Sequence, residues 1–295
     1  MKLTSPSHVR ALLEEIGQRP SRRAGQNFLI DANILRILIE TAELSPRDRV
    51  LEIGPGLGTV TEELLAAGCE VIAVERDPIL FDVLKSRLPG RERLALMRAD
   101  FLDLVAAPPA GFSFDKVVSN LPYSAGSRML VELFRMEPAP ARIVVTVQLE
   151  VAERLAAGPG TPGRGLLSVW AQLGYEVAIR KKISPTCFWP VPGVWSAIVD
   201  MRRVVRPAAS TCDLALFYAL TRLTFTHRRK QIPTSLGRAD GDLHLPAARA
   251  QEILAELGLD PKSRPEDLSV EEWCAFSNRM AEETKHQTPA HSREG

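Results

Sequence analysis

The stretch that decides the fold is Arg49-Val50-Leu51-Glu52-Ile53-Gly54-Pro55-Gly56-Leu57-Gly58. It begins with a short, mostly apolar run typical of a buried strand, and it continues into glycines at alternate positions. Glycines at a strand-to-helix turn let the backbone approach a ligand closely, because no Cβ stands in the way. The third glycine comes one residue too early for the dinucleotide fingerprint Gly-x-Gly-x-x-Gly. The stretch therefore predicts a strand, then a loop, then a helix. The loop either binds a cofactor of the nucleotide type or is a plain turn.

Strand and helix patterns alternate on both sides of this loop. Strands are predicted at 49–53, 70–75, 94–98, 116–119 and 142–147, and helices after Asp31 and over 59–67, 78–88 and 126–135. This alternation predicts an α/β fold with a Rossmann-like, doubly wound and mostly parallel sheet. Such sheets bind ligands at the carboxyl ends of their strands. The glycine loop, Glu75, Asp100 and Asn120 all fall at or just after such ends.

The rest of the chain divides into further segments. A Gly/Pro-rich break at 158–163 precedes residues 166–203, which are predicted to be strands and extended segments, and 211–282 have helical spacing. We therefore expect a basic N-terminal segment (1–30, with a short helix over 8–16), a sheet domain (31–205), a small all-helical C-terminal domain (206–282) and a polar, disordered tail (283–295).

Composition narrows the protein class. The chain has 295 residues, 45% of them hydrophobic and 25% charged, which is typical of a soluble globular protein of one or two domains. The formal net charge of +1 neither indicates nor excludes a nucleic-acid partner, because a local basic patch is enough to attract one. Four scattered cysteines show no metal-ligand spacing, so we expect free thiols and no metal. We find no membrane-spanning run and no secretory core, and we expect a cytoplasmic monomer.

Two carboxylates follow predicted strands. Glu75 can accept hydrogen bonds from both hydroxyls of a ribose, and its alternative is a surface ion pair with Arg76. Asp100 can accept from an adenine amino group while Phe101 packs on the ring, and its alternative is a helix cap or turn. Both positions are therefore candidates for binding a nucleoside-containing cofactor.

Asn120-Leu121-Pro122-Tyr123 is the most specific motif. An adenine N6 is a poor nucleophile because its lone pair is delocalised into the ring. Two acceptors, the Asn120 side-chain oxygen and the Leu121 carbonyl, can bind its hydrogens and draw the nitrogen toward tetrahedral geometry. Pro122 fixes the turn, and Tyr123 offers a face for stacking. This chemistry needs positioning and electrostatics rather than a strong base, and the alternative is an ordinary strand-ending turn.

Two further clusters have a functional and an ordinary interpretation. Phe188, in Phe188-Trp189-Pro190-Val191-Pro192, can stack on the opposite face of a flipped base, or it can belong to a packed loop. Arg228, Arg229 and Lys230 can contact phosphates, or they can form a solvated helix face.

Taken together, the motifs resemble the small-subunit ribosomal RNA adenine dimethyltransferases over residues 20–280. The resemblance is carried by Gly25-Gln26-Asn27-Phe28-Leu29, the loop from Glu52 to Gly58, Asn120 to Tyr123, Gln148 to Leu155, Leu167-Ser168-Val169, Pro185 to Pro192 and Arg228-Arg229-Lys230. The chain departs from the usual family pattern at 124–128, 193–195 and 232–236.

The resemblance implies a class I methyltransferase sheet. It also implies an enzyme that uses S-adenosylmethionine to dimethylate N6 of two adjacent adenosines near the 3′ end of 16S rRNA. The substrate would be a pre-30S subunit, to which the helical domain docks. We therefore assign cofactor binding to Gln26, Asn27, Leu29, Gly54, Gly56, Gly58, Glu75, Arg76, Asp100, Phe101 and Asn120. Catalysis is assigned to Asn120, Leu121, Pro122, Tyr123 and Phe188, and RNA binding to Arg22, Arg23, Arg228, Arg229 and Lys230.

Three alternatives stay open from the sequence. One is a methyltransferase for a 23S rRNA adenine, of the antibiotic-resistance type. Another is a non-catalytic RNA-binding assembly or transcription factor on the same scaffold. The third is an NAD-dependent dehydrogenase, which the glycine loop alone would allow.

Overall fold

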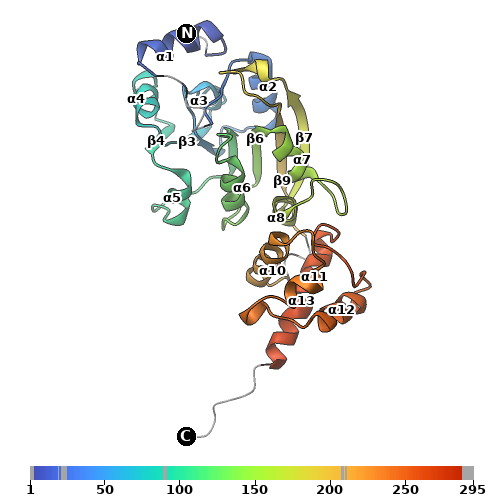
Figure 1. The fold of residues 1–295 in the computed structure, drawn as a ribbon. Coiled ribbons are helices and arrows are strands. Elements are labelled where there is room, and N and C mark those ends of the chain that lie inside the picture. The colour runs from blue at the N-terminus through green and yellow to red at the C-terminus, as the bar shows by residue number, and fades with distance from the viewer. Residues whose placement is uncertain are drawn as a thin grey trace. The chain divides into compact units, whose positions relative to one another are not determined.

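The computed structural model describes residues 3–18, 20, 25–88, 92–206, 209 and 211–287. The chain forms two compact units (Figure 1). The first comprises Met1–Glu153 and Glu176–Arg203, and the second comprises Arg154–Tyr175 and Val204–Gly295.

The first unit is built on a seven-stranded sheet of order β4-β3-β2-β5-β6-β9-β7. Its strands are β2 (Arg49–Ile53), β3 (Glu70–Glu75), β4 (Leu94–Arg98), β5 (Lys116–Asn120), β6 (Arg142–Gln148), β7 (Tyr175–Ile183) and β9 (Ser196–Arg203). The strands β4, β3, β2, β5 and β6 are parallel, whereas β9 is antiparallel to β6. The chain order reverses between β2 and β5, so the carboxyl ends of these two strands form the position at which doubly wound sheets bind ligands. The predicted fold class is confirmed.

Helices precede and connect these strands. They are α1 (Pro6–Glu15), α2 (Ala32–Thr41), α3 (Thr59–Ala66), α4 (Pro78–Arg87), α5 (Phe101–Ala106), α6 (Gly126–Phe134) and α7 (Leu149–Ala156). Side chains cap three of them: Asp31 caps α2, Asp77 caps α4 and Asp100 caps α5. A carboxylate at this position satisfies backbone N–H groups of the first turn that have no partner within the helix.

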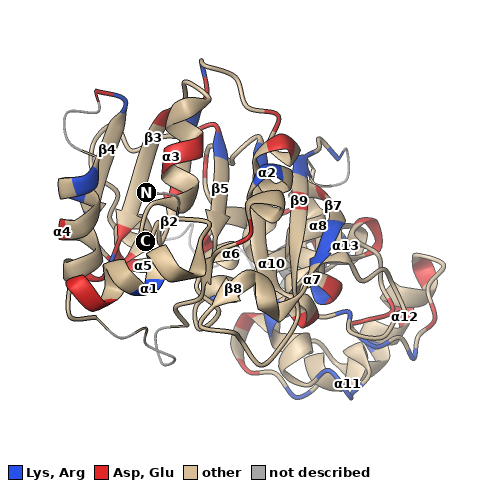
Figure 2. Cartoon of the chain, turned by 90° about the horizontal axis from the view of Figure 1, so that it is seen from above, with Lys and Arg blue, Asp and Glu red and all other residues tan. Residues whose placement is uncertain are grey.

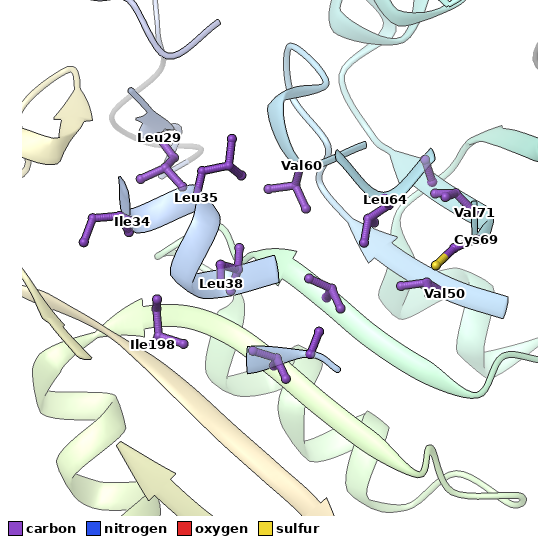
Figure 3. Packing of buried hydrophobic residues seen from close by; sticks show 14 of the residues in the cluster. Leu29, Ile34, Leu35, Leu38, Val50, Val60, Leu64, Cys69, Val71 and Ile198 are labelled. Carbon is purple, nitrogen blue, oxygen red and sulfur yellow. The ribbon is translucent and has the colours of Figure 1, made fainter. Parts of the chain in front are cut away.

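The core of the sheet unit is apolar and closely packed. Figure 3 shows Leu35 and Leu38 of α2, Val60 and Leu64 of α3, and sheet residues such as Ile198 in one cluster. Burial of such side chains provides the main driving force for folding. The loops at the strand ends therefore extend from a packed apolar core.

A second, two-stranded sheet joins two distant segments of the first unit. It pairs β1 (Phe28–Leu29) with β8 (Phe188–Trp189) in antiparallel register, so that Leu29 lies opposite Phe188. The short helix η1 (Pro185–Cys187) leads into β8. This pairing fixes the Gly25-to-Leu29 motif, and no local sequence pattern predicts it.

The second unit is helical. It contains α8 (Leu166–Gly174), α10 (Leu214–Thr226), α11 (Ile232–Leu236), η2 (Gly241–Leu243), α12 (Ala247–Glu256) and α13 (Val270–Gln287). Trp170 of α8 is buried, its ring packs edge-on against Tyr218 at 4.8 Å between centroids, and its Nε1 donates to Thr221 Oγ1 at 2.9 Å. The segment 154–175 thus belongs with the C-terminal helices, whereas the sequence assigned it to the sheet domain.

Two further sequence predictions were wrong. Residues 166–174 are a helix rather than extended chain, because a nearly continuous apolar run does not distinguish a buried strand from a buried helix. Residues 283–287 continue α13 rather than belonging to a disordered tail. The remaining residues of that tail, 288–295, lie outside the described part of the chain, as do Arg22 and Arg23.

Candidate functional site

A cavity of about 320 Å³ lies at the carboxyl ends of the central strands. Its lining includes nearly all the residues assigned to the cofactor and three residues of the Asn120-to-Tyr123 motif, which we call the target motif. These lining residues are Gln26, Asn27, Leu29, Gly54, Gly56, Glu75, Arg76, Asp100, Phe101, Asn120, Leu121 and Pro122. Gly58, Tyr123 and Phe188 are not part of this lining. Glu52, Asp77, Ser124 and Met129 also line the cavity and were not assigned from the sequence.

The glycine loop turns sharply out of β2. Gly54, Gly56 and Gly58 all have positive φ, of 69°, 61° and 91°. A Cβ on Gly56 would stand 3.1 Å from the Phe28 ring, and one on Gly58 would stand 2.8 Å from Leu84 Cδ2 of α4. Gly54 and Gly56 thus shape the cavity wall, whereas Gly58 allows close packing of α4 against the loop.

Glu75 ends β3 and is held in a fixed orientation. Its Oε2 accepts from Gly56 N at 3.0 Å and its Oε1 from Asp77 N at 2.8 Å. Burial raises the pKa of this carboxyl, although the two backbone donors oppose the shift. Each oxygen keeps lone-pair capacity for a second donor. The side chain makes no ion pair with Arg76, which instead contacts Asp100 at 3.2 Å.

Asp100 caps a helix, as one of its two sequence interpretations expected, and it also lines the cavity. Its Oδ1 accepts from Leu102 N at 2.9 Å and caps α5, while the residue also lines the cavity. Phe101 is buried with its side chain at the same wall. The cap fixes the carboxylate where a polar group of a ligand would reach it.

Glu52 is a buried acid beneath the loop. It is 1% exposed, and Thr61 Oγ1 donates to its Oε2 at 2.6 Å. Burial, together with the nearby charge of Glu75, raises the pKa of Glu52 to about 8. The sequence did not predict that Glu52 is a buried, proton-holding acid, because the residue lies within a mostly apolar strand pattern.

The raised pKa of Glu52 predicts a pH-dependent stability. The folded protein holds this proton up to about pH 8, whereas the unfolded chain releases it near 4.5, so stability falls as pH rises through that window. We expect the free energy of unfolding of Glu52→Gln, relative to wild type, to increase by roughly 1–3 kcal/mol between about pH 5 and about pH 8. Denaturant titrations of the ligand-free protein at both pH values measure this difference.

Glu70→Gln is the matched control for that titration. Glu70 is exposed at the start of β3, so its substitution should leave the pH dependence unchanged. A constant difference between Glu52→Gln and wild type would show that Glu52 is ionised in the folded protein throughout.

The side chain of Asn120 is fixed on both sides. Its Nδ2 donates to the Asn27 carbonyl at 2.8 Å, and its Oδ1 accepts from Thr146 Oγ1. The Leu121 N–H donates to the Thr146 carbonyl at 3.2 Å, and a Cβ on Gly54 would stand 3.4 Å from Pro122 Cγ. The target motif and the glycine loop therefore face one cavity.

Tyr123 and Phe188 lie beside this cavity. The Tyr123 hydroxyl is hydrogen bonded to Ser196 Oγ, and burial raises the pKa of Tyr123 to about 12. The two rings pack edge to face at 6.2 Å between centroids. Phe188 is 0% exposed within the core cluster, as the packed-loop alternative expected, and this conformation offers no face of its ring to a base.

The basic run lies in the second unit. Arg228, Arg229 and Lys230 are exposed in the turn between α10 and α11, so they do not form a helix face. Arg228 Nε lies 3.9 Å from Glu266 Oε1, a weak contact at a half-exposed position. Figure 2 shows basic and acidic residues interspersed along the chain, in keeping with its small net charge.

The described residues contain no helix that is long and apolar enough to cross a bilayer, and no group of three or more potential metal ligands. All four cysteines are free thiols, as predicted.

Comparison with known proteins gives the family. Residues 17–282 match the ribosomal RNA adenine dimethylase family. The chain is 38% identical to ribosomal RNA small subunit methyltransferase A of Streptomyces griseus, over 95% of this chain and 96% of the relative. It is 40% identical to the protein of the same name from Opitutus terrae, over 95% and 99%.

Solved structures agree with the fold. A dimethyladenosine transferase from Plasmodium falciparum superposes with a TM-score of 0.71, at 22% identity, over 85% of this chain and 97% of that one. The 23S rRNA methyltransferase ErmE superposes with a TM-score of 0.62, at 28% identity, over 86% and 100%. From its sequence match over nearly the whole chain, this protein is a methyltransferase that belongs to the ribosomal RNA adenine dimethylase family.

Proposed function

We propose that this protein transfers methyl groups from S-adenosylmethionine to N6 of two adjacent adenosines near the 3′ end of 16S rRNA, during assembly of the small subunit in the cytoplasm. The observation that carries the proposal is that Glu75 and Asn120 face one cavity, at the point where the strand order reverses. The relatives that are named small subunit methyltransferases support the choice of RNA.

The cavity suits S-adenosylmethionine. Glu75 offers acceptor oxygens for the ribose, Asp100 offers one for the adenine amino group, and the wall at Gly54 and Gly56 carries no side chain. Phe101 supplies an apolar surface for a flat ring. When bound, the cofactor supplies a methyl group on a positively charged sulfur, which is strongly electrophilic.

The target base is positioned by the Asn120-to-Tyr123 motif. Asn120 Oδ1 and the Leu121 carbonyl accept the two N6 hydrogens, and the Leu121 carbonyl accepts no hydrogen bond within the described part of the chain. Tyr123 is protonated at neutral pH, as any tyrosine is, and burial raises its pKa further, so we assign a role to its ring and not to its hydroxyl as a base. Rate enhancement then comes from preorganised acceptors and orientation.

Product mapping tests the function. The protein is incubated with isotopically labelled S-adenosylmethionine and either 30S particles or 50S particles from cells that lack this modification. We expect labelled N6,N6-dimethyladenosine in 16S rRNA, detected by mass spectrometry of digested nucleosides. Label in 23S rRNA would instead support the antibiotic-resistance alternative, and binding of the cofactor without transfer would support a non-catalytic role.

The basic run should contribute to RNA affinity. Replacing Arg228, Arg229 and Lys230 with Ala removes three exposed cations, so RNA binding should weaken at low salt. The slope of log K against log salt should become shallower by about 0.7–0.9 for each phosphate that the variant no longer neutralises. Filter binding to the 30S particle over a salt series measures the slope, and the affinity for the cofactor should not change.

The matched control removes three other exposed cations from the same unit. Arg238, Lys262 and Arg264 are exposed and form no ion pair among the described residues. An equal change of slope in both triple variants would show that only the overall charge of the unit matters, and no change in either would exclude the run from the RNA contact.

A further inference from the structure

Thr146 lies directly opposite Asn120 in the parallel pair of β5 and β6. Its Oγ1 donates a hydrogen bond to Asn120 Oδ1, and its side chain is 0% exposed. On the other side of β6, Thr146 pairs with Ile198 of β9, so the residue sits in the interior of the sheet rather than at its edge. The hydroxyl is therefore held between fixed backbones.

The contacts of Asn120 determine which way its amide group points. The Asn27 carbonyl can only accept a hydrogen bond, so the Asn120 amide nitrogen must face it, at 2.8 Å. The amide oxygen then faces Thr146, whose hydroxyl can donate to it. A valine in place of Thr146 would leave the oxygen without this donor.

The same residue also holds the second acceptor of the motif. The Thr146 carbonyl accepts from the Leu121 N–H at 3.2 Å, which fixes the peptide that precedes the Leu121 carbonyl. Side chain and backbone of Thr146 thus contact the two consecutive residues that we propose to bind the N6 hydrogens.

We propose that Thr146 is a positioning residue for methyl transfer, whose hydroxyl keeps the Asn120 oxygen aimed at the amino group of the target base. This inference rests on the proposed function, because it assumes that Asn120 Oδ1 accepts from N6. An amide oxygen has two lone pairs, so it accepts from Thr146 with one and from the base with the other. A rotated amide would present N–H to N–H and repel the substrate.

The orientation matters most for the second methyl group. The unmodified base carries two N6 hydrogens, whereas the monomethylated base carries one, so a single hydrogen bond then positions the nitrogen. An enzyme with a less well oriented Asn120 should therefore slow more in the second transfer than in the first, and monomethylated product should accumulate.

The test compares Thr146→Val, which keeps the shape, with Thr146→Ser, which keeps the hydroxyl. In single turnover with saturating 30S particles, Thr146→Val should slow transfer by about tenfold to a hundredfold, the scale of small misplacements of reacting groups. The ratio of monomethyl to dimethyl product should rise, and the Kd for S-adenosylmethionine should stay within about twofold of wild type. Thr146→Ser should restore the rate to within about threefold.

Two further variants make the result specific. Thr224→Val removes an equally buried hydroxyl from α10 in the other unit, and it should leave the rate and the product ratio unchanged. On an Asn120→Ala background, Thr146→Val should cause no additional loss, because no amide remains to be oriented. Should Thr146→Val fail to fold or to bind cofactor, Thr146→Ala and Thr146→Ser are compared in its place.

The outcomes separate this inference from the proposed function. If Asn120→Ala is slow while Thr146→Val keeps the wild-type rate and product ratio, Thr146 has no positioning role, whereas the proposed role of Asn120 is retained. An additional loss on the Asn120→Ala background would also overturn the inference. If Asn120→Ala itself transfers at the wild-type rate, the assumed role of Asn120 is wrong, and the Thr146 inference is overturned with it.

Discussion

Replacing Asn120 with Ala is expected to lower the single-turnover rate of methyl transfer by about 10²–10³-fold, the usual effect of removing one preorganised polar group from a reacting centre. The Asn120 oxygen is held by Thr146 and its amide nitrogen by Asn27, so little reorganisation is needed when the base arrives. Affinity for RNA depends mainly on phosphate contacts elsewhere and should change by less than about threefold.

To isolate the effect of Asn120 on catalysis, the rate of methyl transfer and the affinity for 30S particles are measured on the same preparation of each variant. Rapid-quench transfer with labelled cofactor gives the rate, and filter binding to 30S particles gives the affinity. Asn120→Asp is an informative second variant, because it keeps an acceptor but places a carboxylate oxygen against the Asn27 carbonyl. A rate for Asn120→Ala within about threefold of wild type would exclude Asn120 as an acceptor for the target amino group, and equal losses in rate and affinity would point to a structural role.

Replacing Glu75 with Ala is expected to weaken S-adenosylmethionine binding by about 1–3 kcal/mol, the scale of hydrogen bonds to a charged group. The carboxylate would no longer be there to accept from the ribose, and the Gly56 and Asp77 N–H groups would have no acceptor in its place. Isothermal titration calorimetry measures the Kd directly, with no requirement for RNA.

Glu75→Gln and Glu70→Ala complete that experiment. Glu75→Gln keeps one acceptor oxygen, so its affinity should fall between those of wild type and Glu75→Ala. Glu70→Ala removes an exposed acid from the other end of β3 and should bind normally. If Glu75→Ala binds as tightly as wild type, Glu75 does not contact the ribose.

The sequence by itself determined the sheet and the residues at its ligand edge. Alternating apolar strands and amphipathic helices are local patterns, and the carboxyl ends of parallel strands meet by necessity, so the sequence pattern alone places Gly54, Glu75, Asp100 and Asn120 together. Asp31 was predicted as a helix cap for an equally local reason, because its oxygen accepts from N–H groups two and three residues ahead.

Only the tertiary structure decided the contacts that depend on distant segments. The pairing of Leu29 with Phe188 joins residues far apart in the chain, and the same pairing buries Phe188 instead of exposing its ring. The raised pKa of Glu52 arises from burial, which an acidic residue within a strand pattern does not reveal. Likewise, the sequence pattern shows Thr146 only as one residue of a predicted buried strand. Its contact with Asn120 follows from the register of β5 and β6. Local sequence specifies the periodicity of an element, whereas register, burial and hydrogen-bond partners are set by what packs against it.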